Sequence, residues 1–138
     1  MVSRSVVRAA WVSAWLPFAL GCEPPPALIG GAELFTTRCA SCHGTAGDGT
    51  GPLAAELRVQ PANLRTIAKR NAGKFDEAAV MATIDGRRAI AGHGPREMPV
   101  WGEVFKSEFS ADGAPRPRNT ALLRSRLLTD YVMTLQDD

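Results

Sequence analysis

The stretch that decides the fold reads RCASCHGTAGDGTGP and occupies residues 38–52. It places Cys39 and Cys42 three residues apart and puts His43 directly after them, in a chain with only 3 cysteines and 2 histidines. Four glycines, an aspartate and a proline then fill residues 44–52, a composition typical of a loop. The chemical role of these two cysteines and the adjacent histidine therefore decides which fold and which function we expect.

Three chemistries use Cys-x-x-Cys-His spacing. In covalent haem attachment, the cysteines bind the porphyrin vinyl groups and the histidine binds the iron. A zinc site needs four ligands, and here it would have to combine the adjacent Cys42 and His43 with Cys39 and His93. A redox dithiol usually opens a helix, whereas this motif follows a predicted one. The pattern favours haem, with Cys39 and Cys42 as the covalent attachment and His43 as an axial iron ligand.

A second axial ligand is expected from one of the methionines. Met81 and Met133 fall on apolar faces of predicted helices, where methionine usually serves packing. Met98 falls in GPREMPVWG, an irregular stretch that Pro99 stiffens, so its thioether is the predicted sixth ligand of the iron. His93 is the alternative, and an imidazole there would lower the reduction potential relative to methionine.

The N-terminus resembles an export signal over residues 1–21. Arg4 and Arg8 are followed by the uncharged run AAWVSAWLPFALG, which is too short for a full membrane span of about 20 apolar residues. The ending FALGC resembles a bacterial lipobox, which predicts lipidation of Cys22. An ordinary signal peptide or an uncleaved anchor are the alternatives.

Residues 22–30 contain three prolines and are expected to form a stiff tether. The remaining domain is 31–138. Two or more acyl chains hold a protein on a bilayer durably, so the predicted location is the bacterial periplasm, at a membrane.

Composition excludes a nucleic-acid partner. The 16 Lys and Arg include two in the signal, which leaves the mature chain with as many basic as acidic residues, 14 of each. The basic clusters are short and form no phosphate-binding stripe. A domain of this size is near the lower limit for a stable core, so a cofactor that enlarges the core is expected.

Hydrophobic periodicity predicts an all-α domain with long loops. The first expected helix runs from about Gly31 into the motif. Two further helices are expected in 61–73, capped by Asn63 and ended by Gly73, and in 74–86, capped by Asp76 and ended by Gly86. The last is expected in 119–136, where Leu123, Leu127, Tyr131 and Leu135 recur at spacings of four. Residues 86–99 are expected to be irregular and 106–118 to form a loop.

The chain resembles the class I cytochromes c over nearly the whole mature domain. Gly31 and Phe35 precede Cys39 by eight and four residues, the pattern by which the family's first helix crosses its last. Tyr131 matches the aromatic position of that last helix. The resemblance implies a small cytochrome c fold, with helices and loops wrapped around one covalently attached haem.

The resemblance also implies positions around the iron. TGPL, residues 50–53, resembles the family's Gly-Pro turn, which would make the carbonyl of Pro52 the acceptor for the ring of His43. MPVWG around Met98 resembles the methionine ligand loop of small bacterial members. The loop from Lys106 to Arg118 is longer than in the smallest members, so no partner contact is carried over to it.

Cations and a tryptophan in the segment expected to wrap the haem have two interpretations each. Arg87, Arg88 and Arg96 are expected either to pair with a haem propionate or to remain solvated. Trp101 is expected to cover the ring or to donate to a propionate. These are candidate cofactor contacts.

The function indicated is one-electron carriage in a bacterial respiratory or related chain, not catalysis. A haem with both axial positions filled exchanges electrons at its edge with donor and acceptor proteins, which the tether would restrict to membrane-bound ones. The protein would act as a monomer or as a subunit of an oxidoreductase complex. The alternative is haem-based binding or sensing of a small ligand, or a peroxidase-type activity, if Met98 is displaceable.

Overall fold

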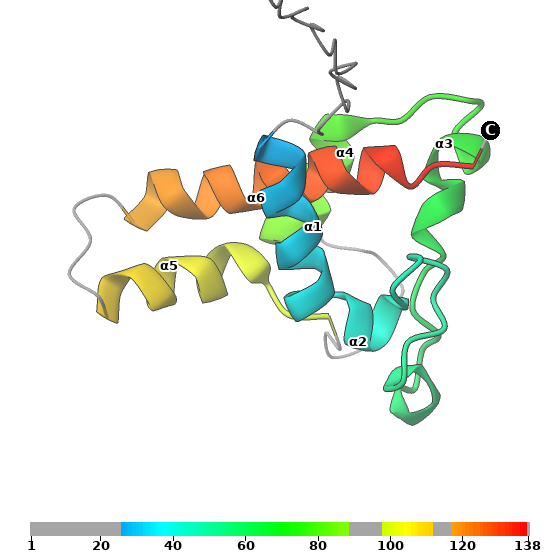
Figure 1. The fold of residues 1–138 in the computed structure, drawn as a ribbon, viewed down its shortest axis with the longest axis horizontal. Helices are drawn as coiled ribbons and strands as arrows, with labels where there is room; N and C mark the ends of the chain where they lie inside the picture. Colours follow the sequence, from blue (N-terminus) through cyan, green and yellow to red (C-terminus); the bar gives the residue numbers. More distant parts are fainter. Residues whose placement is uncertain (1–25, 89–97, 112–116, 138) are drawn as a thin grey trace, which may run out of the picture.

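The computed structural model describes residues 26–88, 98–111 and 117–137 of the 138-residue chain. Every regular element in these ranges is helical, which confirms the prediction of an all-α fold. In chain order the elements are α1 (Pro26–Arg38), α2 (Ala40–His43), η1 (Ala54–Glu56), η2 (Leu64–Thr66), α3 (Ile67–Arg70), α4 (Glu77–Asp85), α5 (Trp101–Ala111) and α6 (Pro117–Thr134), as Figure 1 shows. None of the helices in the described ranges is long and apolar enough to cross a bilayer.

The C-terminal helix α6 organises the packing. It contacts α1, α4 and α5, and Figure 1 shows α1 crossing it while α5 runs alongside. The buried apolar side chains of the core come from five helices: Phe35, Ala40, Ile84, Phe105, Ala121, Leu128 and Val132. Full burial of a large apolar side chain stabilises a fold by roughly 1.5–3 kcal/mol, so this small set supplies much of the folding free energy.

The crossing of α1 and α6 depends on a glycine. A Cβ atom at Gly31 would lie 2.4 Å from the carbonyl oxygen of Leu127 and 2.9 Å from the Cβ of Tyr131, so only glycine permits this approach. One turn further on, the rings of Phe35 and Tyr131 pack with centroids 5.2 Å apart. The crossing predicted from Gly31, Phe35 and Tyr131 is confirmed.

The predicted last helix is also confirmed, but Leu123, the first residue of the row at spacings of four, does not pack in the core, whereas Tyr131 and Leu135 pack against it. Leu123 is 56% exposed, whereas Ala121, Ser125 and Leu128 are at most 2% exposed. The difference arises because α4 and α5 pack against α6 on the side away from Leu123.

The predicted helix caps are present. The side chain of Asn63 accepts a hydrogen bond from the backbone N–H of Arg65 at 2.9 Å, and that of Asp76 accepts from Ala79 at 2.9 Å. Each cap satisfies a backbone donor that the first helical turn leaves unpaired. Gly86 ends α4 in the left-handed region, with φ of 86°.

The first helix starts earlier than predicted. It begins at Pro26 rather than near Gly31, so the last five residues of the expected tether 22–30 are helical. Proline suits the first helical position because its missing N–H has no partner there and its fixed φ is already helical. Cys22 and the rest of the tether lie outside the described residues.

The loop expected over 106–118 was wrong for its first part, since α5 extends to Ala111. Phe105 is fully buried, and the guanidinium of Arg124 lies 5.3 Å from the centre of its ring. Glu108 of α5 pairs with Arg124 at 2.6 Å. Packing on α6 therefore stabilises a helix in whose sequence polar and apolar residues are mixed.

Candidate functional site

The Cys-x-x-Cys-His segment lies at the C-terminal end of α1, and α2 carries the chain on from it. Cys39 is the one residue between these two helices. Its N–H donates to the carbonyl of Phe35 at 2.8 Å, and the N–H of His43 donates to the carbonyl of Cys39 at 2.9 Å. Since Phe35 is anchored in the core, the crossing of α1 and α6 sets the position of both cysteines and the histidine.

The glycine-rich loop folds back onto this segment through backbone hydrogen bonds. Gly51 N–H donates to the carbonyl of Cys42 at 3.1 Å, and Leu53 N–H donates to that of Ser41 at 2.9 Å. A Cβ atom at Gly51 would lie 2.5 Å from the Ser41 carbonyl oxygen. The loop can approach the motif this closely only because it carries glycine there.

The imidazole of His43 is held through one of its two nitrogens. Its Nδ1 lies 3.0 Å from the carbonyl oxygen of Ala62, and because a carbonyl only accepts, Nδ1 is the donor. Burial lowers the pKa of His43, against the opposing effect of the bond to Ala62, so the ring is neutral near pH 7. A neutral imidazole with Nδ1 occupied presents Nε2 to a metal.

The assignment of Pro52 as partner of His43 was wrong. Pro52 is exposed, and the carbonyl that accepts from His43 belongs to Ala62. The reason is the path of the loop: Leu64 N–H donates to the carbonyl of Gly47 at 2.7 Å, which brings the chain back beneath the imidazole. No residue type in the sequence marks this acceptor, because any residue can supply a backbone carbonyl.

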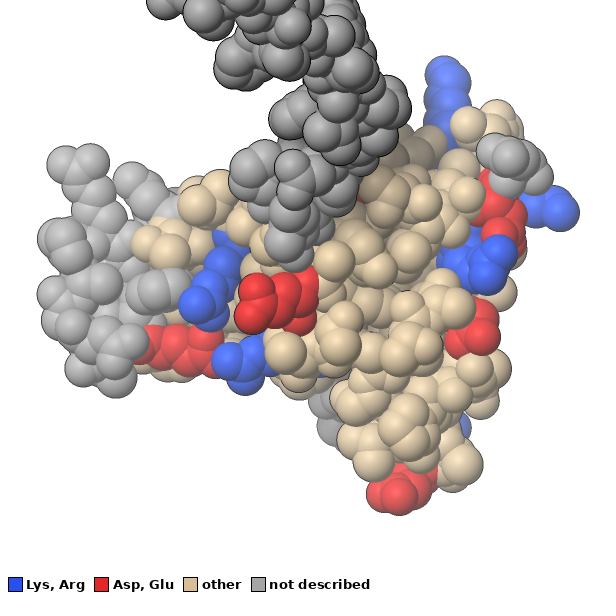
Figure 2. Space-filling model, viewed as in Figure 1, with Lys and Arg blue, Asp and Glu red and all other residues tan. Residues whose placement is uncertain are grey.

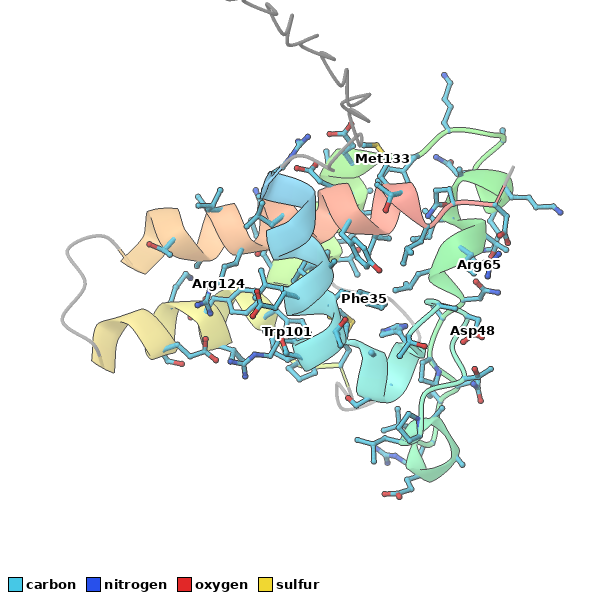
Figure 3. The ribbon with its side chains drawn as sticks, in the orientation of Figure 1. Phe35, Asp48, Arg65, Trp101, Arg124 and Met133 are labelled. Atoms are coloured by element: carbon cyan, nitrogen blue, oxygen red, sulfur yellow. The ribbon has the colours of Figure 1, made fainter. Side chains whose placement is uncertain are left out.

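Sequence reasoning also missed Gln136, which positions the segment after Ala62. Its side-chain NH2 donates to the carbonyl of Leu64 at 2.9 Å, and its carbonyl oxygen accepts from the N–H of Ala68 at 2.9 Å. The end of the chain beyond α6 thus clamps the η2–α3 segment. Figure 3 shows Arg65 of that segment on the same side of the molecule as Asp48 of the glycine-rich loop.

A cavity of about 430 Å³ lies between the motif, η2, α3, α4 and α6. His43 and Met98, from segments far apart in the chain, both line it. Apolar side chains supply most of its remaining wall: Phe35, Ala62, Leu64, Ile67, Ala79, Val80, Ile84, Leu128 and Val132. The volume is within the usual range for a cofactor pocket.

Of the two motif cysteines, Cys39 lines the cavity, whereas Cys42 is not among the residues that do. Neither forms a disulfide. Burial, with a smaller effect of Cys42, raises the pKa of Cys39 to about 12, so its thiol is uncharged at neutral pH. A dithiol redox site needs a lowered thiol pKa, and Cys39 has the opposite shift.

The candidate cofactor contacts separate in the structure. Arg88 lines the cavity, as does Arg70, which the sequence did not single out. Arg87 instead pairs with the buried carboxylate of Asp85 at 2.6 Å. Trp101 packs on Phe105 with ring centroids 5.7 Å apart and is not among the described residues that line the cavity; Figure 3 shows it apart from the loop that carries Asp48. His93 and Arg96 lie outside the described residues.

The residues present fit a haem better than a bare metal ion. Within residues 26–88, 98–111 and 117–137, no three His, Cys, Asp or Glu side chains gather as a metal site. Among the described residues that line the cavity, His43 is the only imidazole and Met98 the only thioether, and most of the rest of the wall is apolar. A haem would match this donor set, with His43 and Met98 as the residues that would hold its iron and the apolar wall enclosing its ring.

The comparisons with known proteins agree with this fit. Residues 29–112, well over half of the chain, match the family model of cytochrome c. Neither the curated proteins nor the solved structures gave a match. Members of the matched family bind haem c covalently and use it for electron transfer. The family match, the helical fold and the cavity built on Cys-x-x-Cys-His together show that the chain belongs to the cytochrome c family.

Proposed function

We propose that this protein is a one-electron carrier of a bacterial respiratory or related chain, with a single haem ligated by His43 and Met98 and attached through Cys39 and Cys42. The observation that supports it best is that the cavity is lined by His43 and Met98 together. When bound, the haem supplies a one-electron iron couple, and a neutral thioether ligand favours its reduced form.

The chain's own residues would hold the group rather than act on a substrate. Cys39 and Cys42 would fix the ring to the end of α1. The carbonyl of Ala62 orients the imidazole of His43, as outer partners of metal ligands commonly do. The apolar walls from α4 and α6 exclude water, which limits the charge reorganisation that accompanies electron exchange. With Met98 at the sixth position, no site remains for a substrate at the iron.

The proposed setting is the periplasmic side of a membrane, through lipidation of Cys22. Donor and acceptor would then be membrane-bound redox proteins, with this chain a monomeric carrier or a subunit of their complex. The mature chain has equal numbers of acidic and basic residues, so association with partners should depend little on ionic strength.

Visible spectroscopy of the protein matured with the haem-attachment machinery tests the ligation. A weak far-red band in the oxidised form is expected from iron–thioether bonding, and Met98→Ala should abolish it. Met81→Ala is the matched control, because Met81 lies in α4 and does not line the cavity. The control should keep the band.

Three results would contradict the proposal in different ways. A band that survives Met98→Ala would exclude this methionine as ligand. Prompt carbon monoxide binding by the reduced wild-type protein would indicate an open iron and the alternative function of small-ligand binding. A matured protein without a Soret band would contradict haem attachment itself.

A further inference from the structure

The exposed apolar side chains gather mainly on one helix. Among the described residues five large hydrophobic side chains are exposed, and three of them belong to α6: Leu122 at 39%, Leu123 at 56% and Met133 at 40%. Leu122 and Met133 are eleven residues apart, or three turns of the helix, so they lie on the same face. The other two, Leu53 and Val59 at 42% each, lie on the loop around η1.

A groove runs beside this face of α6, along its crossing with α1. It has a volume of about 460 Å³, and its apolar lining comes from Gly30, Leu34, Leu123 and Leu127. Figure 3 shows Met133 on the side of α6 from which α1 starts. The groove and the exposed face are therefore both close to the place where the chain enters the first helix.

Three charged residues line the groove. Arg38 and Arg124 both pair with Glu108, at 2.9 and 2.6 Å, whereas Glu33 is exposed. On the outer side of α6, Arg126 pairs with Glu77 at 2.9 Å and with Asp130 at 2.8 Å. Figure 2 shows acidic and basic side chains near the middle of the face that carries α1 and α6, beside a broader uncharged area. When a protein surface approaches lipid, charges that are paired with each other lose less hydration free energy than isolated charges do.

The length of chain between the proposed anchor and α1 limits where this surface can be. Only three residues, Glu23, Pro24 and Pro25, separate Cys22 from Pro26, the first residue of α1. Fully extended, the four residue steps from Cys22 to Pro26 span at most about 14 Å. With Cys22 acylated at the bilayer surface, the start of α1 cannot move further than this from the lipid headgroups.

We infer that the outer side of α6 and the α1–α6 groove lie against the lipid surface, with Leu123 in the headgroup region. This inference rests on the proposed lipidation of Cys22. Leu123 and Leu127 of α6 line the groove, whereas Leu128 and Val132 of the same helix line the haem-binding cavity. With the groove against lipid, the cavity therefore lies on a different side of α6, open to partner proteins.

Spin labels at two positions test the orientation in the mature, lipidated holoprotein, reconstituted in nanodiscs of phosphatidylethanolamine and phosphatidylglycerol. One label is attached at Leu123→Cys and the matched control at Leu53→Cys, an exposed leucine on the η1 loop. Collision rates with oxygen and with a water-soluble nickel complex report depth in the lipid. The oxygen-to-nickel ratio should be at least about twofold higher at position 123 than at position 53, since an interfacial apolar face enters the headgroup boundary.

The outcomes separate the anchor from the orientation. Release from the membrane by Cys22→Ser, with lipid-like accessibility only at position 123, supports both. Release by Cys22→Ser, with equal, water-like ratios at both positions, overturns the orientation and leaves the anchor. A wild-type protein absent from the membrane fraction overturns both. Restricted label motion at position 123 that persists in lipid-free Cys22→Ser protein would show that another protein surface, not lipid, covers the groove.

Discussion

The segment that carries His43 and the segment that carries Met98 meet at one cavity, but the chain holds them in different ways. Around His43, short-range backbone hydrogen bonds tie the motif to the glycine-rich loop, and the imidazole itself is bonded to Ala62. Met98 lies three residues before α5, whose position depends on packing against α4 and α6.

Because of this difference, we expect His43 and Met98 to respond to different perturbations. A local backbone network is either formed or lost, so damage near His43 should affect haem attachment and folding together. A ligand that depends on the docking of a helix can shift while the rest of the domain stays folded. The following variants test whether the two sides separate in this way.

The largest effect is expected from Gly51→Ala on the His43 side. The new Cβ would meet the carbonyl oxygens of Ser41 and Ala40 at 2.5 and 2.6 Å, so the loop must leave the motif. We expect a loss of about 3 kcal/mol or more in stability and a reduced yield of haem-loaded protein. Thermal unfolding and the Soret absorbance per mole of protein measure both.

Gly30→Ala is the control for this variant. Its Cβ would meet only the side chain of Leu127 on α6, at 3.6 Å, which is an ordinary van der Waals contact. Equal stability and haem content of Gly51→Ala and Gly30→Ala would contradict the importance of the close loop contact.

A smaller effect is expected from Gly102→Ala on the Met98 side. A Cβ there would lie 2.6 Å from the carbonyl oxygen of Asp85, which forces α5 away from the end of α4. We expect a loss of about 2 kcal/mol, normal haem attachment and a weakened far-red band, because Met98 moves with the start of α5. Loss of haem attachment instead of the band would show that the two sides are not separable.

A structural feature could be predicted from the sequence where it requires a particular residue type at a particular position. The motif, the Asn63 and Asp76 caps and the Gly31–Phe35 crossing were predicted, because each depends on a residue type with a specific local role. The acceptor for His43 was missed because it is a backbone carbonyl, which any residue could supply. Its position follows from the fold-back of the loop, not from the nature of Ala62.

The helix before α6 was missed for a different physical reason. Its polar residues resemble those of a surface loop, and its main apolar anchor, Phe105, is buried only because α6 packs over it. Trp101 was expected at the haem for the same reason: without the helix, its contact with Phe105 could not be foreseen. Features that exist only through tertiary packing are poorly visible in local patterns.

Gln136→Ala should have an intermediate effect on the His43 side. It removes the bonds to the carbonyl of Leu64 and to the N–H of Ala68 and leaves two partly buried backbone groups without this partner. We expect a loss of about 2 kcal/mol with an unchanged far-red band. Thr134→Ala is the control, since its exposed hydroxyl bonds only within α6 in the described structure. If Gln136→Ala loses the far-red band but keeps its stability, Gln136 supports the segment that carries Met98 and not the one that carries His43.

Arg88→Gln should change the reduction potential more than stability. Arg88 lines the cavity, so its positive charge disfavours the oxidised iron, and its removal should lower the potential by on the order of tens of millivolts. Arg87→Gln is the matched control, because the adjacent Arg87 pairs with Asp85 and does not line the cavity. Redox titration of both holoproteins tests this prediction. Equal shifts of the reduction potential in Arg88→Gln and Arg87→Gln would show that the position of Arg88 at the cavity wall does not determine its effect on the potential.

The smallest effect concerns the charge of Asp48 in the glycine-rich loop. Its carboxylate accepts from the Thr50 hydroxyl at 2.7 Å and the Thr50 N–H at 3.0 Å, and these bonds, the hydroxyl first, hold the pKa of Asp48 below its usual value. Because the folded pKa is lower than the unfolded one, the charge stabilises the fold above the unfolded pKa of about 3.9, and this contribution is lost as the pH falls through the folded pKa. Asp48→Asn should therefore unfold at a lower temperature than wild type near neutral pH and lose that difference in acid. Glu56→Gln, a charge removal in the nearby η1, is the control. A gap between wild type and Asp48→Asn that stays constant or grows in acid would show that the loop does not depend on this carboxylate.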